Sequence, residues 1–237
     1  MASDDQPLAS LSLTHVAYNP SDPYSYVSAW LALVPQGLCI IYVTLMWATR
    51  EIEVWMMFAG QMSCEALNFA LKRWIREERP RQIVGKGYGM PSSHSQFVAF
   101  FSLSLTLFLM LRHQPTPHTS YRPSTFIERL ALSVLACFCA VLVAVSRIYL
   151  NYHTPRQVWI GFGAGLIFAV VWFLFTSYLR NAGWIDWGLD LEVAKQLRFR
   201  DLIMTEDLQD AGWGRWEARQ RTRRAVPNGG VAKRKAK

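Results

Sequence analysis

Charged residues are almost absent from five long stretches of this 237-residue chain. Residues 23–49, 87–111, 130–146 and 157–179 contain no Asp, Glu, Lys or Arg, and residues 54–71 contain a single acid. A soluble domain interrupts such runs with polar residues at helical spacing, whereas a membrane-crossing helix needs roughly 20 mostly apolar residues. The sequence therefore predicts an all-α, polytopic transmembrane helix bundle of about five spans.

Cysteines and acidic clusters are also scarce. The four cysteines all lie within the apolar stretches, and their spacing matches neither a metal-binding pattern nor a disulfide framework. A two-metal phosphatase needs several clustered carboxylates, and neither such a cluster nor a pair of histidines one helical turn apart occurs in the sequence. A glycine-rich phosphate loop of the Walker type is missing too. We therefore expect no bound metal and no cofactor.

Basic residues exceed acidic ones, giving a formal net charge of +8. Nucleic-acid binding is one explanation of this charge, but most of the chain is predicted to lie in lipid and no recognition motif is visible. The basic residues gather at the ends of the predicted spans, which favours a role in membrane topology and in binding an anionic substrate. We expect the lipid bilayer as a partner and no nucleic acid, while the oligomeric state stays open.

Three polar segments interrupt the apolar pattern, at residues 72–80, 90–95 and 146–157. The first follows the second predicted span, the next opens the third span, and the last joins the fourth span to the fifth. Because successive spans reverse direction, all three segments are expected at the same membrane face. The sequence thus predicts one site at a membrane face, assembled from segments far apart along the chain.

The first two segments each admit a chemical and a structural interpretation. Lys72 and Arg79 are seven residues apart, so on a helix both point toward one site; they equally suit cations that extend to the membrane edge. Ser92, Ser93 and His94 precede a predicted helix, whose free N–H groups bind anions. A histidine there can protonate a departing oxygen, but the pattern also suits a serine helix cap with an incidental histidine.

The third segment places a guanidinium near an imidazole. Arg147 matches phosphate geometry through two parallel hydrogen bonds, and neutral His153 is a competent nucleophile toward phosphorus. Gln157, one helical turn further on, can accept a hydrogen bond from the ring of His153 and so fix its tautomer. Thr154 and Gln157 also form a capping-box pattern, with Pro155 at the first helical position. The two roles of Gln157 are compatible.

Together these residues resemble the three-part signature of the type 2 phosphatidic acid phosphatase superfamily, over roughly residues 72–157. The resemblance implies that His153 attacks phosphorus and carries a phosphohistidine, and that His94 protonates the leaving oxygen. It implies that five residues hold the phosphate oxygens, namely Lys72, Arg79, Ser92, Ser93 and Arg147. Two positions depart from the family. Ser93 stands where glycine is usual, and Gln157 stands where aspartate is usual, so Gln157 can orient His153 but cannot offset an imidazolium charge.

The stretch Met-Pro-Ser-Ser-His-Ser-Gln around His94 and the stretch His-Thr-x-x-Gln-Val from His153 are similar to the eukaryotic dolichyl diphosphate phosphatase branch. That branch implies removal of one phosphate from the polyprenyl lipid dolichyl diphosphate, which yields dolichyl phosphate for reuse in N-glycosylation. Two alternatives stay open. One is a lipid phosphatase acting on phosphatidate or a sphingoid phosphate, and the other is a lipid-binding scaffold without catalysis.

The basic C-terminal segment and the loop between the third and fourth spans lie opposite the predicted site. Positive charge favours the cytoplasmic side, so the site is predicted at the lumenal face of the endoplasmic-reticulum membrane. Residues 233–237 resemble the dilysine retrieval signal of that membrane's proteins. We expect an N-terminal tail at residues 1–22, a transmembrane phosphatase domain at 23–180 and a cytoplasmic C-terminal tail at 181–237.

Overall fold

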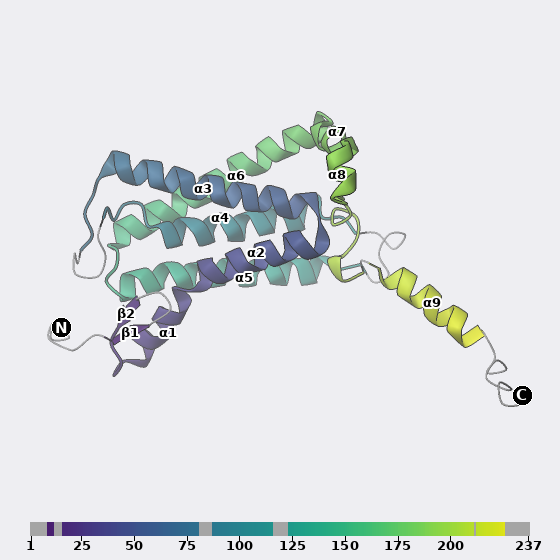
Figure 1. The fold of residues 1–237 in the computed structure, drawn as a ribbon. Coiled ribbons are helices and arrows are strands. Elements are labelled where there is room, and N and C mark those ends of the chain that lie inside the picture. The colour runs from purple at the N-terminus through teal and green to yellow at the C-terminus, as the bar shows by residue number, and fades with distance from the viewer. Residues whose placement is uncertain (1–8, 12–15, 81–86, 116–122, 211, 226–237) are drawn as a thin grey trace, which may run out of the picture.

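The computed structural model describes residues 9–11, 16–80, 87–115, 123–210 and 212–225, and it is dominated by helices (Figure 1). Two short antiparallel strands, β1 (Ala9–Leu11) and β2 (Val16–Tyr18), precede the bundle. The bundle is built from α1 (Pro23–Leu31), α2 (Val34–Thr49), α3 (Ile52–Ile75), α4 (Ser93–Leu107) with its π-helical extension η2 (Phe108–Arg112), α5 (Phe126–Tyr149) and α6 (Pro155–Asn181). It is followed by α7 (Trp184–Asp190), α8 (Glu192–Gln196), η3 (Leu208–Asp210) and α9 (Trp213–Ala225).

Among the described residues, four helical stretches are long and apolar enough to cross a membrane, and they correspond to four of the five predicted spans. The remaining helix, α3, is as long as α5 but carries Gln61 and Asn68, which are buried against the other helices. Figure 1 shows α3 running beside α4 along the bundle, so we count α3 as a span despite its polar residues. The prediction of an all-α bundle of about five spans is confirmed.

The first predicted span is not one continuous helix. Helix α1 ends at Leu31 and α2 begins at Val34, with Pro35 in the first turn of α2. Proline has no N–H to donate and suits the start of a helix, where that donor is not needed. The break leaves the backbone carbonyl of Ala32 available to a partner outside the helix.

Helix α4 lies at the centre of the bundle and packs extensively on α6. Gly161 and Gly165 of α6 face it directly. A Cβ atom on Gly161 would lie 2.7 Å from the backbone oxygen of Ser92, and one on Gly165 would lie 2.3 Å from that of Gln96. Small residues spaced four apart let two membrane helices approach at backbone distance. This contact fixes the start of α4 against the start of α6.

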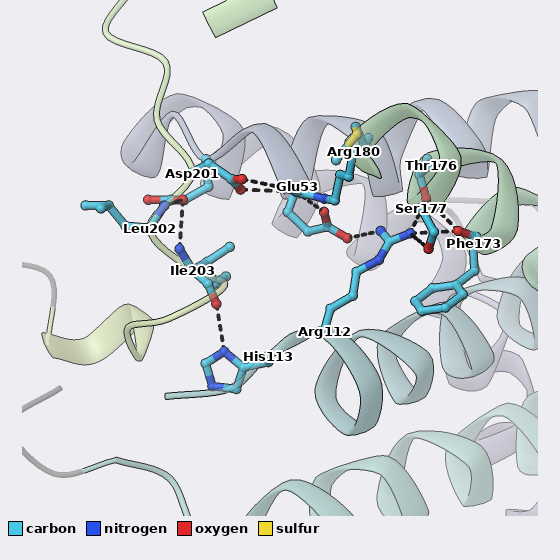
Figure 2. Close-up of polar contacts among 12 residues, drawn as sticks. Glu53, Arg112, His113, Phe173, Thr176, Ser177, Arg180, Asp201, Leu202 and Ile203 are labelled. Carbon is cyan, nitrogen blue, oxygen red and sulfur yellow. Dashed lines mark hydrogen bonds and ion pairs between the residues drawn. The ribbon is translucent and has the colours of Figure 1, made fainter. Parts of the chain in front are cut away.

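Buried ion pairs hold the other end of the bundle, where α3 begins and α6 ends (Figure 2). Glu53 accepts hydrogen bonds from Arg112 Nη1 at 2.6 Å and from Arg180 Nη2 at 2.5 Å. Arg180 also pairs with Asp201 at 2.5 Å. Arg112 donates further hydrogen bonds to the Phe173 carbonyl, Thr176 and Ser177. In this group, which we call the Glu53 network, each arginine faces a carboxylate.

The chain returns to this end of the bundle after α8. Glu51 accepts hydrogen bonds from the backbone N–H groups of Leu202 and Ile203. The ring of His113 lies 2.7 Å from the Ile203 carbonyl and 3.0 Å from Asp207 Oδ1. The segment that follows the bundle is therefore packed against it as far as Asp207. Residues 233–237 lie outside the described residues, so the retrieval signal and the three-part domain division stay predictions.

Candidate active site

The three polar segments meet at the end of the bundle opposite the Glu53 network. Lys72 lies in the last turn of α3, Ser92 and Ser93 stand at the start of α4, and Arg147 lies in the last turn of α5. His153 lies just before α6. The charges of Lys72 and Arg147 act on both His94 and His153, which places these side chains in one site. The structure thus brings together the segments that the alternation of spans predicts to meet.

Gln157 connects two of these segments through a fully used amide group. Its oxygen accepts hydrogen bonds from His153 Nδ1 and from the Thr154 N–H, both at 3.3 Å. Its nitrogen donates to Glu77 Oε1 and to the Glu78 carbonyl, both at 2.9 Å. The Gln157 N–H and Thr154 Oγ1 complete the capping box at 3.2 Å, so the predicted helix cap is confirmed. The same side chain therefore caps α6 and contacts His153.

The surroundings of His153 fix both its charge and its tautomer. Burial, reinforced by the positive charge of Arg79, lowers the pKa of His153 to about 4, although the hydrogen bond with Gln157 opposes this shift. The ring is therefore neutral near pH 7. Because an amide oxygen can only accept, the ring proton is on Nδ1 and the lone pair is on Nε2. A neutral imidazole with a free Nε2 lone pair has the form that a nucleophile requires.

The helical relationship predicted between Lys72 and Arg79 is wrong. Helix α3 ends at Ile75, and Arg76 adopts a left-handed φ of 54° that turns the chain out of the helix. Arg79 reaches the site from the extended segment that follows. Pro80 explains this difference, because a proline disfavours helical conformation in the residue before it.

Three cations of the site form no close ion pair with a carboxylate, although the charge of Glu65 acts on Lys72 over a longer distance. In the described parts of the chain, no ion pair joins Lys72, Arg79 or Arg147 to a carboxylate. Arg147 is only 2% exposed, and its guanidinium lies 5.2 Å from the centre of the Tyr152 ring. A buried charge without a counter-ion is costly. The cluster is therefore suited to binding an anion, in contrast to the Glu53 network.

The start of α4 differs from a simple serine cap. Ser92 occupies the cap position, but its side chain makes no capping hydrogen bond. Its hydroxyl instead accepts from Ser95 at 3.2 Å, and its N–H donates to the Gln157 carbonyl at 3.2 Å. His94 Nε2 lies 3.2 Å from the Ala32 carbonyl freed by the break between α1 and α2. The serines and His94 are thus held by α6 and by the first span, and the cap interpretation does not account for Ser92.

The sequence pattern does not indicate several residues that support the site. Asn68 of α3 donates to Gln96 Oε1 at 2.7 Å and to the Pro91 carbonyl at 3.4 Å, which ties the start of α4 to α3. Asn68 and Gln96 are polar residues inside apolar spans. Such residues indicate a contact between helices, because buried polar groups in membranes need partners. The contact of Glu77 with Gln157 has no counterpart in sequence spacing.

This arrangement combines a neutral imidazole, a second histidine and three cations that form no close ion pair in the described residues, at a helix start. Phosphoryl transfer mainly requires positioning and neutralisation of the charge on phosphate oxygens. In the described residues no three His, Cys, Asp or Glu side chains gather as a metal site. The expectation of a metal-independent reaction stays a prediction.

Comparison with known proteins defines the class. The family model "PAP2 superfamily" matches residues 53–181. The fold resembles the crystal structure of a transmembrane PAP2-type phosphatidylglycerolphosphate phosphatase from Bacillus subtilis, with a TM-score of 0.54 and 22% identity over 68% of this chain and 80% of that one. The chain is thus an integral-membrane phosphatase by class, and it belongs to the PAP2 superfamily.

Curated relatives narrow the class further. A Neurospora crassa protein provisionally named dolichyldiphosphatase is 45% identical and covers 95% of this chain and 98% of its own length. Human dolichyldiphosphatase 1 is 40% identical over 73% of this chain and 76% of its own. The Saccharomyces cerevisiae dolichyldiphosphatase is 30% identical over 79% of both chains.

Proposed function

We propose that this protein hydrolyses dolichyl diphosphate to dolichyl phosphate and inorganic phosphate. The observation that carries the proposal is the cluster of three cations, which form no close ion pair in the described residues, beside a neutral, tautomer-fixed His153. The names of its relatives supply the lipid. A diphosphate on a tail too apolar to leave the bilayer requires a site at the membrane boundary, where the starts of α4 and α6 lie.

In the first step, His153 Nε2 attacks the terminal phosphorus and forms an N–P bond. The bond between that phosphorus and the bridging oxygen breaks, and His94, in its imidazolium form beside the bound diphosphate anion, gives its Nδ1 proton to the departing oxygen, which leaves as dolichyl phosphate. The Ala32 carbonyl holds Nε2 of His94, which leaves Nδ1 for proton transfer. Lys72, Arg79, Arg147, the Ser92 hydroxyl and the Ser93 N–H hold the phosphoryl oxygens during transfer.

In the second step, water attacks the phosphohistidine and His94 takes a proton from that water. The N–P bond breaks, inorganic phosphate leaves, and His153 returns to its neutral form. We place this reaction at the lumenal face of the endoplasmic-reticulum membrane, with the C-terminus in the cytoplasm. The basic residues of α9, at the end of the chain beyond the Glu53 network, support this orientation.

The decisive experiment is phosphate release by the purified protein in a strong chelator. We expect release from dolichyl diphosphate, with phosphatidate and a sphingoid phosphate cleaved more slowly. His153→Ala is expected to lose several orders of magnitude in kcat while still inserting and binding lipid. Wild-type protein quenched during turnover is expected to carry acid-labile phosphate on His153.

Each alternative has its own outcome. Preferential cleavage of a monophosphate lipid identifies a different lipid phosphatase, and binding without turnover identifies a scaffold. Activity that disappears in chelator and returns with one added metal overturns the metal-independent mechanism.

A further inference from the structure

The nucleophile of this site develops positive charge in an already positive environment. When neutral His153 forms a bond from Nε2 to phosphorus, its ring acquires imidazolium character while Nδ1 keeps its proton. Lys72, Arg79 and Arg147 act electrostatically on the same ring and oppose that charge. Gln157, which contacts Nδ1, is neutral. The site therefore needs a negative charge near His153 that the capping glutamine does not carry.

Glu77 is the carboxylate connected to that ring. Its Oε1 accepts a hydrogen bond from Gln157 Nε2 at 2.9 Å, and the oxygen of the same amide faces His153 Nδ1 at 3.3 Å. These hydrogen bonds run without a gap from His153 through Gln157 to Glu77. The Gln157 amide has only one orientation that fits, because both of its N–H groups face acceptors. A carboxylate that accepts a hydrogen bond from the amide N–H pushes electron density toward the amide oxygen and makes that oxygen a stronger acceptor.

The backbone around Glu77 holds this carboxylate in place. The Glu77 carbonyl accepts from the Gly89 N–H at 2.7 Å, which fastens the extended segment after α3 to the segment before α4. A Cβ at position 89 would lie 2.9 Å from Gln157 Oε1, so a side chain there would displace this amide. Arg156 lies 3.8 Å from the other oxygen of Glu77, but its side chain is 73% exposed, so this contact neutralises the carboxylate weakly.

We propose that Glu77 is a positioning residue whose charge stabilises the imidazolium form of His153 through the amide of Gln157. This inference rests on the proposed function, because it assumes His153 as the nucleophile. Glu77 does not touch the substrate. It accepts a hydrogen bond from Gln157, which in turn orients the nucleophile. Together, Glu77 and Gln157 supply the orientation and the negative charge that a single carboxylate beside His153 would otherwise provide.

A merely structural role is the competing account, in which Glu77 ties residues 76–79 to α6. The two accounts differ in how they respond to moving the charge. Glu77→Gln removes the charge and leaves a side chain of the same shape. Gln157→Glu places a negative charge beside His153. The new carboxylate then lies against the carboxylate of Glu77, and the two repel each other. Combining both changes leaves one carboxylate in contact with the ring.

The experiment measures dolichyl diphosphate hydrolysis, with kcat and KM determined separately, for the wild type, both single variants and the double variant. Outer partners of catalytic groups typically contribute about 10–100-fold in activity. We expect Glu77→Gln to lower kcat in that range with little change in KM, and Gln157→Glu to lower it as well. The double variant is expected to exceed both single variants in kcat.

Asp22→Asn is the matched control, since it also converts a carboxylate to an amide at this end of the bundle and keeps a competent cap for α1. It is expected to retain wild-type kcat. The inference is overturned if Glu77→Gln behaves like this control, or if the double variant does not exceed both single variants in kcat. A wild-type protein that leaves dolichyl diphosphate uncleaved overturns the proposed function instead. Melting temperatures of all variants identify any loss of folding.

Discussion

The amide oxygen of Gln157 lies 3.3 Å from Nδ1 of His153, on the residue that also closes the capping box of α6. A capping residue and a contact of the candidate nucleophile are thus one side chain, and mutation can separate the two roles.

Gln157→Leu removes both roles, whereas Thr154→Ala removes the cap and leaves the glutamine. A lost cap costs about 0.5–2 kcal/mol of stability without changing the chemistry. We therefore expect Gln157→Leu to lower kcat far more than Thr154→Ala, with Gln157→Glu between Leu and the wild type. If both variants lower the melting temperature alike and leave kcat unchanged, Gln157 serves only as a cap.

The protonation of His153 gives a second test. Burial lowers the pKa of His153 to about 4, so the reactive neutral form persists well below the ordinary histidine value. As pH falls from 7, the ring is expected to stay neutral until near pH 4, where protonation would remove the lone pair of the proposed nucleophile. Titration of ring ¹⁵N shifts in the substrate-free protein, assigned with His153→Gln, measures this directly. A midpoint near 6.5 contradicts the burial of this ring.

The contact between α4 and α6 predicts a contrast between two glycines of one helix. Gly165→Ala places a Cβ 2.3 Å from a backbone oxygen, so the helices must separate, and overpacking of this kind typically costs about 1–3 kcal/mol. Gly163→Ala meets no atom within 4 Å and gains helix propensity. Melting curves in detergent are expected to show a lower melting temperature for Gly165→Ala and an unchanged or higher one for Gly163→Ala. Equal melting temperatures contradict the close approach.

The Glu53 network predicts a loss of stability far from the site. Glu53→Gln leaves Arg112 and Arg180 without their shared carboxylate, and breaking a buried ion pair costs about 3–5 kcal/mol. Asp190→Asn breaks an exposed pair with Lys195 and serves as the control, with little expected change. Thermal unfolding with activity measured per folded molecule checks this. A loss of kcat in Glu53→Gln without a drop in melting temperature contradicts a purely structural role.

The orientation in the membrane is tested with sealed microsomes. A cysteine introduced at Gly87, near the site, is expected to react with an impermeant reagent only after the membrane is opened. A protease added outside is expected to cleave the C-terminal segment without opening. The reverse pattern inverts the proposed topology.

The spans and the meeting of three distant segments follow from the sequence, because long apolar runs determine helices in lipid and their alternation determines which ends meet. The position of Arg79 was mispredicted from spacing, although Pro80 carried the signal. The contacts of Glu77 and Ala32 with the site were not predictable, because both depend on how the chain bends where a helix stops. Asn68 falls between these cases, as a polar residue whose burial is foreseeable but whose partner is not.

The cations at the two ends of the bundle differ in one respect that bears on turnover. In the Glu53 network each arginine has a carboxylate, whereas Lys72, Arg79 and Arg147 have none in the described chain. Inorganic phosphate, the small product of the proposed reaction, carries negative charge that can pair with these cations. Its departure is therefore expected to be slow compared with cleavage. We therefore expect inorganic phosphate to inhibit turnover. The rate of the enzyme is then expected to fall as the phosphate concentration on the side of the membrane that holds the site rises.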